Sequence, residues 1–436
     1  MKPKYICLPP GKKSIDVIKR DRKVSSPSLT REFDFVYKKA KGMHIYDLDG
    51  RKYLDFTSSI AVMNAGHSNP AILREIKKQL SRGTHAGFSD FYAELPVKFI
   101  EYLLSLLPKK FNKVFLSNSG TESVEAAFKL ARYKTGKKWS LAFEGAFHGR
   151  TMGSLSLTQS NKVQKKGFEP FLQVKHAKFA YCYRCPWNKK PETCSMECSA
   201  DLKKKVNENK GKLAALFFEP IQGEGGYVVP PIEFLQEAQE LCIKNGMLFC
   251  ADEVQSGCFR TGKFLASETM KISPDIVSMS KAIGGGLPLG ATIASEKIMD
   301  WPKGAHANTF GGNLVACAAG HAALEFIKKN NLQENAEKTG KIMLNELEKL
   351  KDKYELIGDV RGKGLMIGVE LVKDKKSKKH ALNERHEVLC KAKEKGLLLL
   401  PAGKSSIRFC PPLIISKEEA LKGTDIFEDA LKEVSR

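Results

Sequence analysis

Apolar and polar positions repeat along this chain with two different periods. Residues 35–56 alternate apolar and polar side chains on both sides of a turn at Asp49-Gly50, which predicts a β-hairpin. Apolar side chains at helical spacing predict helices, at residues 71–80, 93–107, 122–133 and 233–245. Short apolar runs predict buried strands, at residues 114–116, 140–143, 214–218, 248–251 and 276–279.

In the middle of the chain the expected strands and helices alternate. Such alternation is typical of a mainly parallel sheet with helices on both faces. Beyond about residue 313 the pattern changes to two helices, strands at residues 365–371 and 406–409, and a closing helix. We therefore expect an α/β fold with a large domain and a smaller α+β domain, over residues 71–315 and 316–436, with residues 1–70 contributing to the smaller one.

Composition narrows the class of protein. The chain of 436 residues is 42% hydrophobic and 28% charged, which is ordinary for a globular protein. No run of about eighteen apolar residues occurs, so we expect no membrane span. Residues 1–30 are rich in Lys, Pro and Ser and should wrap over the surface, and their first part is too interrupted by proline for a secretory signal. We expect a cytoplasmic protein.

The net charge of the chain raises the question of an anionic partner. The formal net charge of +23 is compatible with nucleic acid or a membrane surface as a partner. The basic residues are spread widely, however, and the densest stretches, residues 203–205 and 373–380, carry no interleaved aromatic side chains. We expect a lysine-rich solvated surface and no nucleic-acid partner, while one focused anion site stays compatible with the charge.

Two of the buried runs end in residues whose side chains can take part in catalysis. Residues 247–251 lead into Asp252, and residues 275–279 lead into Ser280-Lys281 before a glycine-rich loop. A lysine and a carboxylate, each at its own strand end, are what pyridoxal phosphate (PLP) requires. The lysine holds the aldehyde as a Schiff base, and the carboxylate keeps the pyridine nitrogen protonated. Taken singly, Asp252 also fits a helix cap and Lys281 a solvated loop lysine.

A third strand end fits the phosphate of such a cofactor. The run around Leu116 passes through Ser119, Gly120 and Thr121 into a helix start, where backbone N–H groups and the helix dipole favour an anion. Thr121 on its own also fits a helix cap. No Gly-x-x-x-x-Gly-Lys-Ser/Thr motif occurs, so a nucleotide is not indicated.

Together these residues resemble a known family. From about residue 35 to the C-terminus the chain is similar to class III aminotransferases, fold-type I PLP enzymes of the 4-aminobutyrate (GABA), ornithine and acetylornithine kind. The resemblance rests on motifs in family order: NSGTE at residues 118–122, FHGRT at 147–151, EPIQGEGG at 219–226, DEVQ at 252–255, RTG at 260–262, SK at 280–281, TFGGN at 309–313 and RFCPP at 408–412.

The resemblance implies roles for individual residues. Lys281 and Asp252 are the catalytic pair, Phe147 and Val254 enclose the cofactor ring, and Thr309 reaches the phosphate from a partner subunit. A homodimer or a dimer of dimers with shared active sites is therefore implied. The full set expected to bind the cofactor is Ser119, Gly120, Thr121, Phe147, His148, Asp252, Val254, Gln255, Lys281 and Thr309.

Four further residues carry the implied substrate class. Arg408 resembles the family arginine that grips a substrate α-carboxylate, and Glu224 resembles the glutamate that masks this arginine in one half-reaction. Arg150 is placed to take a distal carboxylate, and Ile60 matches a small apolar position of GABA-type enzymes. These residues favour transfer of an amino group from an ω-amino acid, GABA- or ornithine-like, to 2-oxoglutarate.

An insertion at about residues 181–200 leaves two questions open. Its start, Tyr-Cys-Tyr-Arg-Cys-Pro at residues 181–186, resembles an archaeal branch of the family that includes amino-acid racemases. A PLP-dependent racemase shares the residues named above but must protonate the substrate carbon from both faces, and the sequence identifies no second base.

The second question is the spacing of Cys182, Cys185, Cys194 and Cys198, which is typical of a structural metal site. Zinc, an iron–sulfur cluster, two disulfides and four free thiols all stay open. The other seven cysteines of the chain are scattered, and several lie in apolar runs that predict buried small side chains.

Overall fold

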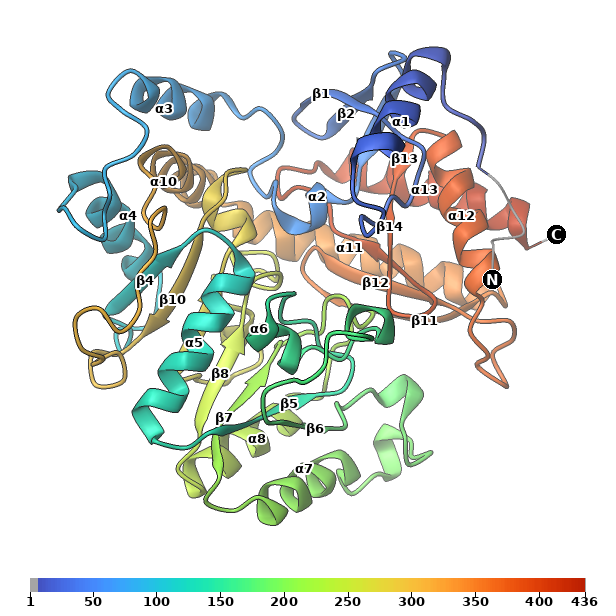
Figure 1. Ribbon diagram of the computed structural model, residues 1–436. Helices are drawn as coiled ribbons and strands as arrows, with labels where there is room; N and C mark the ends of the chain where they lie inside the picture. The colour runs from blue at the N-terminus through green and yellow to red at the C-terminus, as the bar shows by residue number, and fades with distance from the viewer. Residues whose placement is uncertain (1–6, 436) are drawn as a thin grey trace.

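The computed structural model describes residues 7–435. Its largest sheet has seven strands, and helices lie on both sides of it (Figure 1). Six strands run parallel and β10 runs antiparallel to both of its neighbours. Their order across the sheet is β4 (Lys113–Ser117), β10 (Gly290–Ala294), β9 (Ile276–Met279), β8 (Leu248–Asp252), β7 (Leu213–Phe218), β5 (Trp139–Phe143) and β6 (Val174–Ala177).

Strand β7 shows why these strands are continuously apolar. Leu216 and Phe218 pack into one cluster with side chains of α7 (Glu197–Glu208) and α8 (Ile232–Lys244). Ala215 and Phe217 point the other way, into a cluster with side chains of α5 (Gly120–Thr135). Successive residues of a strand face opposite sides, so a sheet covered on both faces needs apolar residues at every position.

Two smaller sheets gather the ends of the chain. The hairpin expected around Asp49-Gly50 forms between the second and third strands of one sheet, whose order is β1 (Tyr37–Lys41), β2 (His44–Asp47), β3 (Lys52–Asp55) and β13 (Leu397–Leu398). The other sheet, which carries Arg408, has the order β11 (Ile357–Lys363), β12 (Met366–Leu371), β15 (Ser406–Phe409) and β14 (Leu400–Ala402).

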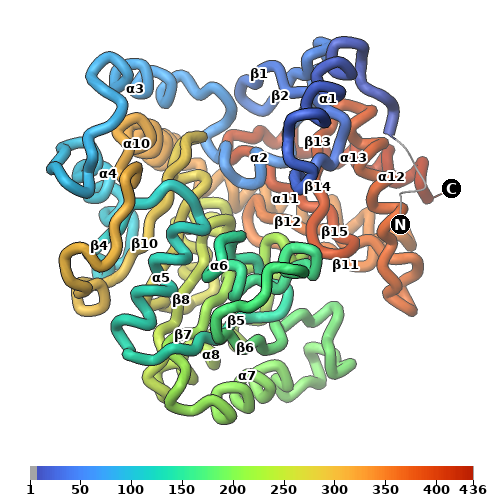
Figure 2. Tube along the Cα trace, in the orientation of Figure 1, coloured from blue at the N-terminus to red at the C-terminus, as the bar shows by residue number. Residues whose placement is uncertain are grey.

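The parallel pairing of β3 with β13 ties the N-terminal segment to the C-terminal part (Figure 2). That contact agrees with the expected contribution of residues 1–70 to the smaller domain, and the domain limits themselves stay a prediction. The longer helices outside the central sheet are α1 (Lys12–Val24), α3 (Pro70–Leu80), α4 (Glu94–Ser105), α10 (Leu314–Lys329), α11 (Leu332–Lys353), α12 (Leu382–Glu394) and α13 (Lys417–Val434). Short helical turns are α2 (Ser58–Ala61), α6 (Met152–Leu157), α9 (Ala266–Thr269), η1 (Lys162–Gln164), η2 (Cys182–Arg184), η3 (Pro191–Thr193) and η4 (Lys281–Gly284).

The N-terminal segment, expected to wrap over the surface, contains the helix α1. Cys7 forms a disulfide with Cys390 of α12, so the side chains of these two cysteines are not merely buried apolar groups. The chain separation of 383 residues explains why no sequence pattern indicated the bond. Within residues 7–435 no helix combines the length and the apolar character that crossing a bilayer requires.

Candidate active site

The three chemically interesting strand ends meet at one edge of the central sheet. Asp252 is the last residue of β8, Lys281 follows β9, and Ser119 caps α5 directly after β4. A Cβ atom on Gly120 would lie 2.8 Å from Val254 Cγ1 and 3.5 Å from Ser280 Cβ. The turn at Gly120 is therefore pressed against the segments that carry Asp252 and Lys281. Ligands of open α/β sheets bind at this edge, beyond the carboxyl ends of the strands.

Hydroxyl groups organise the turn that starts α5. Ser119 Oγ accepts a hydrogen bond from the backbone N–H of Glu122 at 3.3 Å. Thr121 Oγ1 lies 2.6 Å from Ser154 Oγ and accepts from the backbone N–H of Arg150 at 3.3 Å. The helix start and the segment after Phe147 thus form one polar wall, which suits an anion at a helix N-terminus.

Asp252 is held by a buried histidine. Its Oδ2 lies 2.8 Å from Nδ1 of His148, and its Oδ1 accepts from the backbone N–H of Val254 at 3.1 Å. Asp252 is 6% exposed and His148 is 2% exposed. Burial acts to lower the pKa of His148, but the hydrogen bond and charge of Asp252 outweigh it and raise the pKa overall. The contact with Asp252 therefore favours the charged imidazolium form of His148.

Glu219 is a further site residue to which the sequence assigned no role of its own. It accepts hydrogen bonds from the backbone N–H groups of Phe147 and Gly223, each at 2.9 Å. Burial raises the pKa of its carboxyl group to about 7. Glu219 thereby fixes the half-buried Phe147, whose ring lies under the guanidinium of the exposed Arg150 at 5.7 Å.

Lys281 has the environment of a reactive amine. Burial lowers the pKa of its ammonium group, Arg408 lowers it further, and Asp252 opposes both. A lowered pKa increases the share of neutral, nucleophilic amine. The backbone of Lys281 has a φ of 51°, in the left-handed region that residues other than glycine seldom adopt. Such strained residues concentrate at functional sites.

The residues gathered here fit PLP. Gln255 Oε1 is buried without a hydrogen-bond partner in the described chain, so it is free to meet a polar group of the cofactor ring. The backbone of Gly223 closes on Gln255, because a Cβ atom there would lie 2.4 Å from Gln255 Nε2. A carboxylate and an amine that interact electrostatically, Asp252 and Lys281, lie at the same sheet edge as Phe147 and the turn at the start of α5. PLP needs each of these groups.

Arg408 and Glu224 form an ion pair. Arg408 NH1 lies 3.4 Å from Glu224 Oε2, an ion pair without hydrogen-bond geometry. Arg408 is 5% exposed, and its Nε has no partner in the described chain, so donors remain for a further carboxylate. Arg385 lies close enough to feel both charges and was missed by the sequence analysis.

Ile60 lies in a strained turn that contacts the chain just after the strand carrying Arg408. Four consecutive residues without a glycine, at positions 58–61, have φ values between 47° and 62°. Ser58 Oγ donates to the backbone carbonyl of Cys410 at 2.6 Å, which holds the turn against the strand that carries Arg408. A β-branched residue in this conformation is a genuine outlier. The surrounding fold therefore holds the backbone of Ile60 in a conformation that its β-branched side chain disfavours.

Comparison with known proteins decides the family. The model of the family described as aminotransferase class-III matches residues 26–431. This chain belongs to the class-III aminotransferase family.

Three similar proteins illustrate the family relationship. The leucine/methionine racemase of Thermococcus litoralis is 38% identical over 399 residues, which are 91% of this chain and 90% of the racemase. The acetylornithine aminotransferase of Clostridium acetobutylicum is 38% identical over 409 residues, 92% of this chain and 97% of that enzyme. A solved PLP-bound amine transaminase from an uncultivated Pseudomonas species has a TM-score of 0.87 at 29% identity, covering 94% and 97% of the two chains. The expected family, α/β fold type and enzyme class are confirmed.

Thr309, which the sequence predicts to bind the cofactor, lies outside this cluster in the aminotransferase. It is exposed, in the loop between β10 and α10. Asn308 Nδ2 anchors this loop by donating to the backbone carbonyl of Leu116 at 2.9 Å, in the strand that leads to Ser119. An exposed threonine on an anchored loop is compatible with its expected role toward a partner subunit.

The four cysteines of the insertion line one cavity and are all free thiols, so the two disulfides considered from the sequence do not form. Each is partly buried, and burial raises the pKa of the Cys198 thiol to about 11. Their sulfur atoms do not form a set within 4.8 Å of one another. Across residues 7–435 the one such group is Cys7, His386 and Cys390, two of whose sulfur atoms are joined in a disulfide.

Proposed function

We propose that this aminotransferase transfers an amino group from an ω-amino acid, GABA- or ornithine-like, to 2-oxoglutarate. The observation that supports this substrate class is the contact of Arg408 with Glu224 at 3.4 Å. While Glu224 covers Arg408, an amino acid whose amine is far from its carboxylate has no α-carboxylate site to occupy. When Glu224 moves away, Arg408 can bind the α-carboxylate of the 2-oxo acid in a bidentate manner.

The chain's own residues divide the work of the proposed reaction. PLP, when bound, supplies an electron sink for the bonds to the substrate Cα. Asp252, which lies 2.8 Å from His148 Nδ1, would hold a proton on the pyridine nitrogen, and Gln255 Oε1 would accept a hydrogen bond from the ring hydroxyl. Ser119, Gly120 and Thr121 would bind the phosphate at the start of α5. These residues orient the cofactor and carry no proton to or from the substrate.

Lys281 would move the proton. Its Nζ has a lowered pKa and follows a buried strand, so a neutral amine is available to take the proton from the substrate Cα. Phe147 and Val254 would cover the two faces of the ring, and Ile60 and Arg150 would contact the rest of the substrate. The exposed guanidinium of Arg150 suits a distal carboxylate.

We also infer a cytoplasmic homodimer or dimer of dimers. Exposed aromatic side chains lie near Thr309: Phe310 is 60% exposed, its ring stands 5.3 Å from that of His85, and Phe91 is 71% exposed. Large exposed aromatic groups beside a proposed shared site favour a subunit contact there.

The substrate proposal is tested by incubating the PLP-loaded enzyme with 4-aminobutyrate or ornithine and 2-oxoglutarate. Glutamate should form with at least one donor, and Lys281→Ala should form none. Absence of glutamate from a panel of ω-amino acids, with the cofactor demonstrably bound, would contradict the proposed substrate class.

Racemisation is a second candidate, favoured by the similarity to the leucine/methionine racemase. A racemase must move a proton at both faces of the substrate Cα, of which Lys281 serves one. Its test omits every 2-oxo acid: solvent deuterium should then enter Cα while the D- and L-forms interconvert. Retention of the single starting enantiomer, tested over a panel that includes leucine and methionine, would exclude it for those substrates.

A further inference from the structure

The four cysteines of the insertion come from three separate turns that face one cavity. Cys182 begins η2 and Cys185 follows it, Cys194 follows η3, and Cys198 lies in the first turn of α7. All four line the same cavity, together with apolar groups that include Trp187, Met196 and Pro231. Short turns that bring paired cysteines together are the usual frame of a structural metal site.

The ligand set indicates which metal the cavity suits. Four cysteine side chains line it, and four thiolates are a ligand set of tetrahedral structural zinc sites. Zinc takes four thiolates at about 2.3 Å, which places the sulfur atoms of a tetrahedral site about 3.8 Å apart. The partly buried cysteine side chains therefore have to rotate inward, and the turns that carry them have to close around the ion.

We propose that Cys182, Cys185, Cys194 and Cys198 bind one structural Zn²⁺ ion. Each thiol would release its proton to water on binding, so the ion and four thiolates carry a net charge of −2. Lys189 and Lys190 line the same cavity and offset part of this charge, while Glu197, which lies 3.8 Å from Lys189 Nζ, also lines it. The inference does not depend on which amino acid the enzyme accepts.

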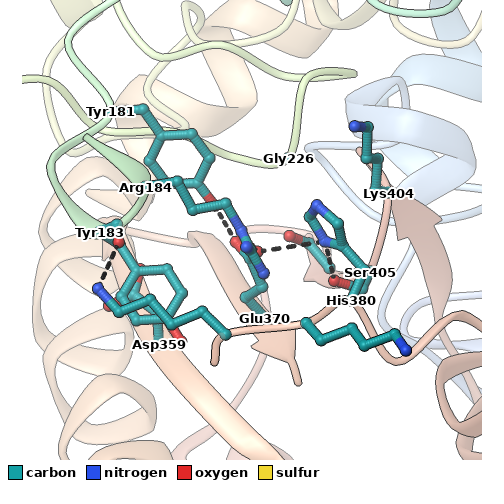
Figure 3. A network of polar contacts seen from close by, with 12 residues as sticks. Tyr181, Tyr183, Arg184, Gly226, Asp359, Glu370, His380, Lys404 and Ser405 are labelled. Carbon is teal, nitrogen blue, oxygen red and sulfur yellow. Dashed lines mark hydrogen bonds and ion pairs between the residues drawn. The ribbon is translucent and has the colours of Figure 1, made fainter. Parts of the chain in front are cut away.

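The structure also shows what such an ion would stabilise. Tyr181 and Arg184, which flank Cys182, both contact Glu370 of β12, and Figure 3 shows the two side chains converging on that carboxylate. Glu370 is 2% exposed, so its charge depends on these partners. Arg361 joins the same carboxylate at 3.0 Å.

Arg361 extends this contact to the substrate site. Its guanidinium donates to the backbone carbonyl of Tyr227 at 3.0 Å and to that of Gly226 at 2.5 Å. These residues directly follow the turn that carries Glu224. A zinc ion in the insertion would therefore hold Tyr181 and Arg184 against Glu370. Through Arg361 it would also stabilise the segment that carries Glu224, the residue proposed to cover Arg408.

The test is metal analysis of PLP-loaded protein purified without chelator, by plasma mass spectrometry. We expect about one zinc per chain and no iron in the unaltered protein. Cys194→Ser and Cys182→Ser should lose the zinc while keeping the absorbance of bound PLP. Cys7→Ser is the matched control, because it removes a cysteine that lies outside this cavity and is bonded to Cys390, and it should leave the zinc content unchanged.

Other results would overturn the proposal. These are protein without bound zinc, zinc retained in Cys194→Ser and Cys182→Ser, or zinc lost only in Cys7→Ser. A second measurement avoids dependence on well-folded variants: chelation of the unaltered protein should lower its melting temperature, and added zinc should restore it. No shift on chelation, with zinc shown to be removed, would contradict a structural role.

Discussion

Replacing Glu224 by glutamine tests the proposed mask on Arg408 directly. At 3.4 Å the ion pair would be worth about 5 kcal/mol at an effective dielectric constant of 20. The side chain of Glu224 is 38% exposed, however, so solvent screening reduces the contribution to about 1 kcal/mol. An α-carboxylate substrate must displace Glu224 to reach Arg408. Glu224→Gln should therefore strengthen the binding of glutamate about fivefold.

The assay measures both half-reactions separately under single-turnover conditions. In Glu224→Gln the concentration of glutamate needed for half-maximal rate should fall about fivefold, while efficiency with the ω-amino donor should fall, because an uncovered Arg408 attracts the donor's carboxylate into the wrong orientation. Glu237→Gln on α8 removes an exposed carboxylate and serves as the control. Equal changes in both half-reactions, or no change in either, would refute the masking role of Glu224.

Three further predictions follow from the site. Lys281→Ala should lower kcat at least about 100-fold with PLP still bound non-covalently, as seen in its absorbance spectrum, and retained turnover would contradict the assignment. Gly120→Ala places a Cβ atom 2.8 Å from Val254 Cγ1, so the dissociation constant of PLP should rise about tenfold in an absorbance titration; unchanged affinity would remove the phosphate role of this turn. Burial raises the pKa of Glu219 from 4.5 to about 7, so stability should fall as pH rises through this window, by on the order of 3 kcal/mol at most. Glu219→Gln should flatten this part of the pH dependence in urea unfolding between about pH 5 and about pH 8, and an unchanged slope would show that another group causes it.

The site residues that could be predicted from the sequence are those with a reactive side chain at the end of a strand. Asp252 and Lys281 each follow a short apolar run, and parallel strands deliver such residues to the same edge. By contrast, β10 was missed because its residues, Gly290–Ala294, are mostly small and form no bulky apolar run. The helix α12 was missed because charged residues interrupt its apolar spacing.

Long-range polar contacts left no signal in the sequence. Glu370 sits in an apolar strand, and its partner Arg184 is 186 residues away in the chain. Nothing local shows that a charge buried in such a strand will find a guanidinium. The left-handed turn that carries Ile60 was equally hidden, because it contains no glycine to mark it. These features depend on packing between segments that only the fold brings together.

The central claim is that this chain transfers amino groups instead of inverting a carbon centre. The most direct measurement is a chiral amino-acid assay of the PLP-loaded enzyme over a substrate panel, with and without 2-oxoglutarate. The account predicts glutamate formation that requires both an ω-amino donor and 2-oxoglutarate, and no interconversion of enantiomers in the absence of a 2-oxo acid. Rapid interconversion without any 2-oxo acid, together with no glutamate in its presence, would contradict the account.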